Sequence, residues 1–226
     1  MKERSPLILL IVVFAVMLAV QLSIWIYNHH IEIGLMLGQE IVLDDFTQSE
    51  FIENVENCYQ KSSESNAEIG GFPYVDGFQA IGERSLRAGE DVFFTRFSGL
   101  PDGVGSFSAK IGNGQVEFIA DEACKAVEEI EFSLDYNLKD YTDFSRSTQL
   151  TFPVIEVEGT FMIEIEFNSI FDNNAYGEEV SSPKTMTLNF NDSEGNPRFE
   201  RHKVRWLDIK VKGLGKIILG PIKIIP

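Results

Sequence analysis

The chain has few of the residues that most often build catalytic or metal-binding sites, with two cysteines and three histidines among 226 residues. Cys58 and Cys124 form no C-x-x-C pair, and no histidine lies near either of them, so a zinc site is not expected. The motifs G-x-S-x-G and H-E-x-x-H and the phosphate-binding loop are also absent. We therefore expect a protein that is not an enzyme and carries no cofactor.

Basic residues are also scarce, at 19 against 35 acidic ones. From Ser5 to Pro197 there are nine basic and 32 acidic residues, whereas Arg198 to Pro226 has eight basic and two acidic ones. The acidic part repels phosphate backbones, which disfavours nucleic-acid binding. The basic end could pair with the acidic part, contact lipid phosphates or engage an acidic partner. The simplest interpretation is that its lysines protect the edges of terminal strands: Lys210, Lys212 and Lys216.

One long stretch has no charge at all, the 22 residues from Pro6 to Tyr27. As a helix it would span about 30 Å, the thickness of a bilayer core. Lys2 and Arg4 precede it, and no basic residue follows closely, so the positive-inside rule keeps the N-terminus in the cytoplasm. A cleavable signal peptide would be shorter and would end in a small-x-small site. The expected organisation is a cytoplasmic N-terminus (1–5), a single-pass transmembrane helix (6–27), a juxtamembrane segment (28–45) and an extracytoplasmic domain at the cell membrane (46–226).

The stretch "ERSPLILLIVVFAVMLAVQ" is loosely similar to the basic-then-apolar starts of archaeal and bacterial type IV pilins. The resemblance implies a filament subunit with a β domain downstream. The chain departs from the pilin pattern at Arg4–Ser5, where a prepilin peptidase expects Gly or Ala, and it has no glutamate in the apolar run.

Beyond Phe72 the apolar residues recur mostly at every second position, which is typical of strands. The alternation is strongest from Ile155 to Phe167, and "IEFSLDYNL" places Ile130 to Leu138 on one face. Gly112–Asn113–Gly114 is typical of a hairpin turn. Two more strands follow Lys203, with a phase slip between Trp206 and Ile209 that indicates a bulge. The pattern predicts a mainly-β domain, an antiparallel sandwich or barrel, with one or two short helices.

The first short helix is predicted over Gln48–Lys61. Thr47 and Glu50 fit a capping box, and Phe46 and Phe51 fit the flanking hydrophobic staple. Residues Phe51, Val55, Cys58 and Tyr59 would share one face of this helix. A second short helix, "DEACKAVEE", would carry Cys124. The segment 31–45 fits either a strand or a continuation of the apolar helix.

The two cysteines are the best candidates for a structural bond. Outside the cytoplasm two cysteines in one domain usually pair, and closing a loop of about 66 residues would stabilise the fold by roughly 4 kcal/mol. We therefore predict a Cys58–Cys124 disulfide, with two buried free thiols as the alternative.

Two acidic turns, "DNNAYGEEVSSP" and "NFNDSEGNPRFE", partly match a calcium-binding loop. Both fail the template, which needs glycine at position 6 and a bidentate acid at position 12, so ordinary hairpin turns are the simpler interpretation. The residues that remain as weak calcium candidates are Asp172, Asn174, Asn189, Asn191 and Glu200.

These observations favour a non-enzymatic, membrane-anchored protein that acts in protein–protein interaction or assembly at the cell surface. The separated charges would suit head-to-tail contacts between subunits. Two alternatives stay open: a ligand- or calcium-binding receptor or adhesin domain, and a pilin-like filament subunit.

Overall fold

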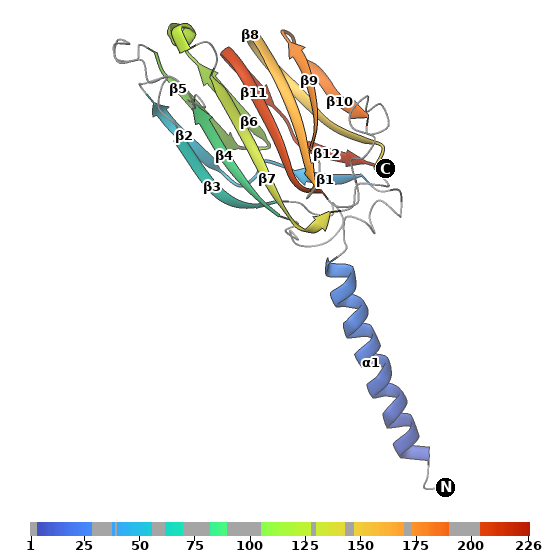
Figure 1. Cartoon of the computed structure of the whole chain (residues 1–226). Helices are drawn as coiled ribbons and strands as arrows, with labels where there is room; N and C mark the ends of the chain where they lie inside the picture. The colour runs from blue at the N-terminus through green and yellow to red at the C-terminus, as the bar shows by residue number, and fades with distance from the viewer. Residues whose placement is uncertain are drawn as a thin grey trace.

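The computed structural model describes residues 4–28, 38, 40–55, 62–69, 82–89, 105–127, 130–142, 147–169, 173–189 and 204–226. Apart from one α-helix and one short 3-10 helix, its regular elements are strands, and every strand pair is antiparallel. The predicted mainly-β antiparallel domain is therefore confirmed (Figure 1).

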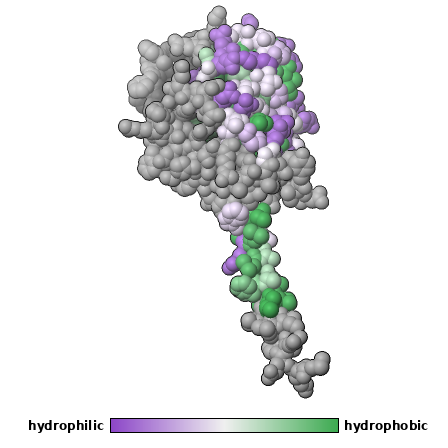
Figure 2. All heavy atoms as spheres, turned by 90° about the vertical axis from the view of Figure 1, so that its right-hand side faces the viewer, coloured by the Kyte–Doolittle hydropathy of each residue, from purple (hydrophilic) through white to green (hydrophobic). Residues whose placement is uncertain are grey.

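The apolar run forms the helix α1 (Arg4–Asn28), as predicted. Its large apolar side chains from Ile11 to Ile26 are 43% to 65% exposed, and Figure 2 shows them as an apolar stretch beside the polar surface of the domain. No helix within the described residues is long and apolar enough to cross a membrane. The predicted transmembrane anchor is thus not supported, and the extracytoplasmic location stays a prediction.

The described strands join in a continuous sheet of 12 strands. Their bounds are β1 (Ile41–Asp44), β2 (Glu50–Val55), β3 (Ser62–Ile69), β4 (Gly82–Gly89), β5 (Phe107–Gly112), β6 (Gln115–Ala120), β7 (Glu131–Thr142), β8 (Gln149–Ser169), β9 (Asn173–Val180), β10 (Lys184–Asn189), β11 (Val204–Leu219) and β12 (Ile222–Ile225). The 3-10 helix η1 (Glu122–Val127) follows β6.

Two long strands, β8 and β11, run through both layers of the fold. The first part of β11 pairs with β7 and its last part pairs with β6, while β8 lies along its other side. Beyond them, β7 continues into β4 and β3, and β6 continues into β5 and β2. The sheet thus divides into a front layer (β3, β4, β7, β9 and the adjoining parts of β8 and β11) and a back layer (Figure 1).

The long strands change neighbours at a group of glycines. Gly159 and Gly215 have φ values of +112° and +108°, which favour glycine. A Cβ atom on Gly215 would lie 1.9 Å from the carbonyl oxygen of Glu158, and one on Gly159 would lie 2.3 Å from that of Leu214. The two backbones approach so closely here that a side chain at either position would separate them.

The core lies between the two layers. Phe132 of the front layer stacks on Phe118 of the back layer with ring centroids 4.8 Å apart, and meets Phe107 edge-on at 6.3 Å. The predicted inward face of β7 is confirmed, since Ile130, Phe132, Leu134, Tyr136 and Leu138 are all buried. The layers are therefore held face to face by apolar side chains at every second position.

The helix predicted over Gln48–Lys61 is wrong where the structure describes it. Residues 50–55 form strand β2, which pairs with β5 and places Ile52 in the core and Phe51 in solvent. Thr47 does not cap a helix, because its backbone N–H and its hydroxyl both donate to Asp45. Pairing with a neighbouring strand has outweighed the local helix signals.

Several local predictions are confirmed. The hairpin joins β5 to β6 through Asn113 and Gly114. "DEACKAVEE" contains η1, and residues 41–44 of the ambiguous segment form strand β1, while 31–37 lie outside the described residues. Both strands after Lys203 are present. The irregularity in β11 falls between Val204 and Trp206, just before the predicted position.

Candidate functional site

Polar side chains line up across the outer surface of the front layer. On β11, Leu207 and Ile209 are buried, so Trp206 and Asp208 point outward. Asp208 lies opposite Asp135 of β7 on one side and Glu166 of β8 on the other. Trp206, in the next row, lies between Asn137 of β7 and Asn168 of β8. The pairing register thus brings together residues that are far apart in the sequence.

These rows border a hollow in the surface with a volume of about 530 Å³. Its lining is polar except for one tryptophan. The lining residues are Ser85, Arg87, Asp135, Asn137, Asn168, Trp206 and Asp208. Because all of them lie on strands, their backbones are held by the sheet.

Hydrogen bonds fix several side chains of the hollow. The carboxylate of Asp135 accepts from Nε of Arg87 and from the hydroxyl of Ser133. Asn168 Nδ2 donates to Oδ2 of Asp208 at 3.2 Å. Arg87 itself is 62% exposed, so its guanidinium reaches solvent at the rim. The site therefore offers carboxylate, amide and guanidinium groups together.

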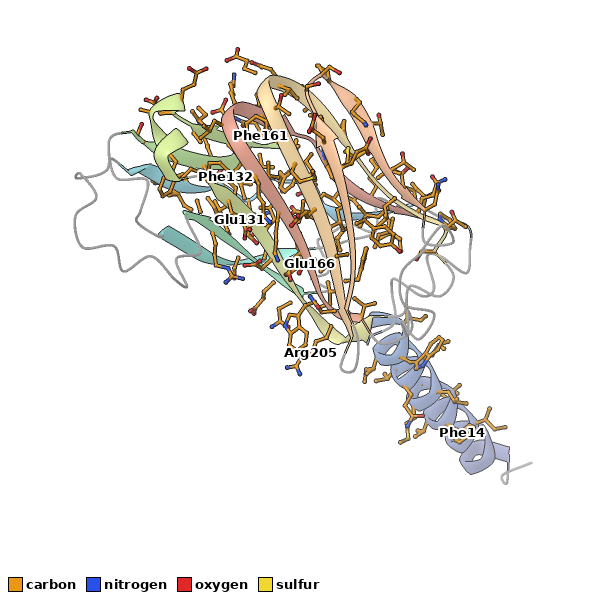
Figure 3. All side chains as sticks on the ribbon, turned by 45° about the horizontal axis from the view of Figure 1, so that its top comes forward. Phe14, Glu131, Phe132, Phe161, Glu166 and Arg205 are labelled. Atoms are coloured by element: carbon orange, nitrogen blue, oxygen red, sulfur yellow. The ribbon has the colours of Figure 1, made fainter. Side chains whose placement is uncertain are left out.

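Trp206 is the one large aromatic side chain in the hollow. It is 37% exposed, which is unusual for a tryptophan in a folded domain. The guanidinium of Arg205 lies over its ring, 4.4 Å from the centroid, and Figure 3 shows Arg205 at the end of the sheet. An indole held in this way offers apolar area beside hydrogen-bonding groups.

Asp208 is the electrostatically unusual residue of the site. The pKa of its carboxyl is raised from 3.8 to about 6, chiefly by burial and then by the Asp135 carboxylate, while Lys210 opposes the shift. The cations nearby are bound elsewhere, since Lys210 lies 2.9 Å from Glu166 and Arg87 contacts Asp135. Among the described residues, no ion pair joins Asp208 to a cation.

The basic segment of the chain is paired internally. Lys212 lies 2.8 Å from Glu164 of β8 and 3.5 Å from Glu131 of β7. Lys216 lies 2.8 Å from Glu156 and 3.5 Å from Glu117. Figure 3 shows Glu131 and Glu166 on either side of β11.

The prediction that these lysines protect strand edges is wrong, because β11 has a neighbour on each side along this stretch. Instead, each lysine neutralises carboxylates of the adjoining strands. The alternative, that the basic end pairs with the acidic part of the same chain, is what the structure shows for Lys210, Lys212, Lys216 and Lys223.

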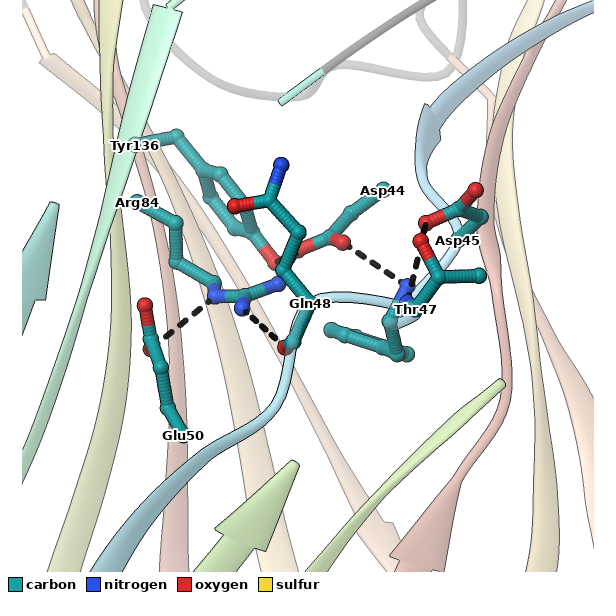
Figure 4. A network of polar contacts seen from close by, with 8 residues as sticks. Asp44, Asp45, Thr47, Gln48, Glu50, Arg84 and Tyr136 are labelled. Carbon is teal, nitrogen blue, oxygen red and sulfur yellow. Dashed lines mark hydrogen bonds and ion pairs between the residues drawn. The ribbon is translucent and has the colours of Figure 1, made fainter. Parts of the chain in front are cut away.

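A buried polar network lies behind the hollow, on the inner side of β4 and β7 (Figure 4). Arg84 is 1% exposed; its Nη1 lies 2.6 Å from Oδ2 of Asp44, and its Nη2 donates to the Gln48 carbonyl at 3.2 Å. Tyr136 donates its hydroxyl to the same Asp44 oxygen at 3.1 Å. Burial raises the pKa of Asp44, and the Arg84 guanidinium opposes that shift. The network joins the two layers and supports the strands that carry the hollow.

The hollow contains none of the calcium candidates that the structure describes. Asp172, Asn191 and Glu200 are outside the described residues, Asn174 lies in β9, and Asn189 ends β10. No group of three His, Cys, Asp or Glu side chains in the described part of the chain could hold a metal ion, and the calcium candidates stay predictions.

Cys124 is fully buried on η1 and is not a free thiol. Its predicted partner Cys58 lies outside the described residues, so the pairing stays a prediction.

The hollow itself was missed from the sequence. The predicted phase slip near Trp206 does mark a segment that lines the hollow, because the irregularity turns the Trp206 ring to the surface. No local sequence pattern predicts the strand register that places Asp135 and Asn168 beside Trp206.

No protein-family model matches the chain, and no curated protein matches it. Among solved structures, it is similar to a family 11 carbohydrate-binding module of a cellulosomal cellulase of Clostridium thermocellum, with 15% identity over 82% of this chain and 94% of that one, and a TM-score of 0.38. It is also similar to a family 28 module specific for non-crystalline cellulose, with 14% identity over 53% and 76% and a TM-score of 0.33. An agarase matches with 12% identity over 62% of this chain and 25% of the agarase, at 0.36. Scores this low do not place the chain in a family.

Proposed function

We propose that the β domain is a non-catalytic carbohydrate-binding domain whose site is the hollow on its front layer. The observation that carries the proposal is the exposed ring of Trp206 beside the carboxylates and amides of the same hollow. Binding sites for small molecules combine apolar or aromatic area with a few placed polar groups. A sugar ring matches both, since its C–H face packs on an indole and its hydroxyls pair with carboxylate, amide and guanidinium groups.

The site is also preorganised for such a ligand. Its side chains project from four adjacent strands, and Asp135 and Asp208 are held by hydrogen bonds from Ser133 and Asn168. A rigid site loses little conformational entropy when a ligand binds. An open hollow with fixed polar groups suits a hydroxyl-rich ligand that keeps part of its surface in water.

One argument for the assembly hypothesis is weakened. The separated charges favoured contacts between the basic end of one subunit and the acidic part of another. Lys210, Lys212, Lys216 and Lys223 are each paired with a carboxylate of their own chain. A head-to-tail contact would first have to break these pairs.

The test is binding of the whole chain to an array of oligosaccharides and polysaccharides. We expect binding to at least one sugar class, and its loss in Trp206→Ala. Phe51→Ala is the matched control, because Phe51 is a 58% exposed aromatic residue on the back layer. If no glycan binds, or if both variants lose binding equally, the proposal is wrong.

A second candidate function, hydrolysis of a glycosidic bond, is favoured by one observation. Asp208, with its pKa near 6, lies opposite the carboxyl of Asp135, and glycosidases use a pair of carboxyl groups. Release of reducing ends from any glycan that binds, and its loss in Asp135→Asn, would identify an enzyme. We expect no such release, because Arg87 and Ser133 already occupy Asp135.

A further inference from the structure

The charges around the hollow are unbalanced in one place. Three carboxylates from adjacent strands lie in a row: Asp135, Asp208 and Glu166. The outer two are neutralised by Arg87 and Lys210, while the central one receives, among the described side chains, the amide of Asn168 alone. A half-buried carboxylate without a cation favours the approach of a positive group.

Within the described part of the chain, the basic side chains near Asp208 are already engaged elsewhere. Lys210 is held at 2.9 Å by Glu166, and Arg205 is placed over the indole of Trp206. The guanidinium of Arg205 covers one face of that ring, and its charge repels a ligand cation from the ring. A positive group on the ligand would therefore contact Asp208 rather than the indole.

We propose that the hollow selects an amino sugar, a ligand whose hydroxyl-bearing ring carries a protonated amine that pairs with Asp208. The inference rests on the proposed function and narrows it to one sugar class. The hollow and the exposed Trp206 ring bind the sugar. The Asp208 carboxylate, which has no cation among the described residues, binds the amine. A hydrogen bond between an ammonium and a carboxylate is stronger than one between neutral groups.

Three oligosaccharides of equal length and the same β-1,4 linkage separate these contributions. Cellohexaose carries a hydroxyl at carbon 2 of each ring, the chitin hexamer an acetamido group and the chitosan hexamer an amine. Isothermal titration of the whole chain should be run at about pH 6.5, which is above the pKa of Asp208 and still acid enough to protonate much of the amine. It should give a dissociation constant about tenfold or more lower for the chitosan hexamer than for cellohexaose.

Asp208→Asn should remove that difference, because an amide keeps the shape of the side chain but carries no negative charge. Glu178→Gln is the matched control: it removes one carboxylate from the exposed pair with Lys184 on the neighbouring hairpin, away from the hollow. It should keep the preference for the amine.

The failures of the two proposals are distinguishable. Equal affinity for all three hexamers would overturn the amine selection and leave carbohydrate binding intact. If the array shows no sugar ligand at all, the function and this inference fall together. Spermidine tests charge alone: if it binds as tightly as the chitosan hexamer, the ligand is a polyamine-type cation and the amino-sugar inference is wrong.

Discussion

Asp208 and Asp135 lie directly opposite each other on β11 and β7, and within the described residues only Asp135 has a cation bound to it. The Asp135 carboxylate adds to the cost of ionising the half-buried Asp208. The ionised form of Asp208 is therefore a local cost to the stability of the sheet.

Replacement of Asp208 by Asn should stabilise the domain at neutral pH. The folded-state pKa of Asp208, about 6, is above the ordinary value of 3.8. The folded state therefore binds the proton more tightly, so this group's favourable contribution is fully present below about pH 4 and is lost as the pH rises through 6. Allowing for partial exposure, we expect a gain of about 1–3 kcal/mol at pH 7.

Urea unfolding at a series of pH values tests this expectation. The difference between Asp208→Asn and the original chain should shrink toward zero as the pH falls from 7 to 4. A variant that is less stable at pH 7, or a difference that grows on acidification, would show that Asp208 is a stabilising ionised group.

The buried ion pair behind the hollow should be intolerant of single changes. Arg84→Met leaves the carboxylate of Asp44 buried without its cation, and we expect a loss of about 3–5 kcal/mol. The double variant Arg84→Met/Asp44→Asn removes both charges and should recover most of that loss. Chemical denaturation of the original chain, the single variants Arg84→Met and Asp44→Asn, and the double variant measures this. An additive loss in the double variant would argue against a coupled pair.

The crossing of β8 and β11 should require glycine. In Gly215→Ala, the new Cβ would start 1.9 Å from the Glu158 carbonyl oxygen and the positive φ would be strained, so we expect a loss of about 2 kcal/mol or more. Gly177→Ala is the control, because its nearest contacts would be at an ordinary 3.6 Å. Equal melting temperatures for the two variants would contradict the close approach.

The lysines of β11 should contribute through their pairs with neighbouring strands. Because Lys212 is 24% exposed, its pairs are partly screened, and Lys212→Met should change stability by about 1 kcal/mol or less. A double-mutant cycle with Glu164→Gln should give a favourable coupling that weakens in high salt. A coupling near zero at low salt would mean that the pair is incidental.

The predicted Cys58–Cys124 disulfide can be tested by mass. The unreduced chain should be about 2 Da lighter than the reduced one, and reduction should lower the free energy of unfolding by roughly 4 kcal/mol or less. Alkylation of two thiols without prior reduction would rule the bond out.

Much of the β architecture could be predicted because side-chain alternation reports directly which face of a strand is buried. The buried row on β7 and the hairpin at Asn113 followed from period and turn residues alone. Residues 50–55 form a strand in place of the start of the predicted helix, because β5 offers backbone partners to residues 50–52 and 55, which local capping signals do not reveal.

The site could not be predicted for a related reason. Trp206, Asp135 and Asn168 meet only through strand register, which depends on the whole sheet. The burial of Arg84 could not be predicted from its neighbours in the sequence either. Its guanidinium is buried because it pairs with Asp44, which lies 40 residues away in the chain. The lysines of the basic end predict strand edges, but composition does not indicate which strands lie at the centre of a sheet.

The central claim is that sugars bind at the hollow, and the chain offers an internal comparison for testing it. It has two tryptophans, Trp206 in the hollow and Trp25 in α1. We suggest titrating the isotope-labelled whole chain with the best oligosaccharide of the array and following both indole N–H resonances by NMR. The account predicts a saturable shift of the Trp206 resonance and none for Trp25. A Trp206 resonance that stays in place while the sugar binds would contradict it.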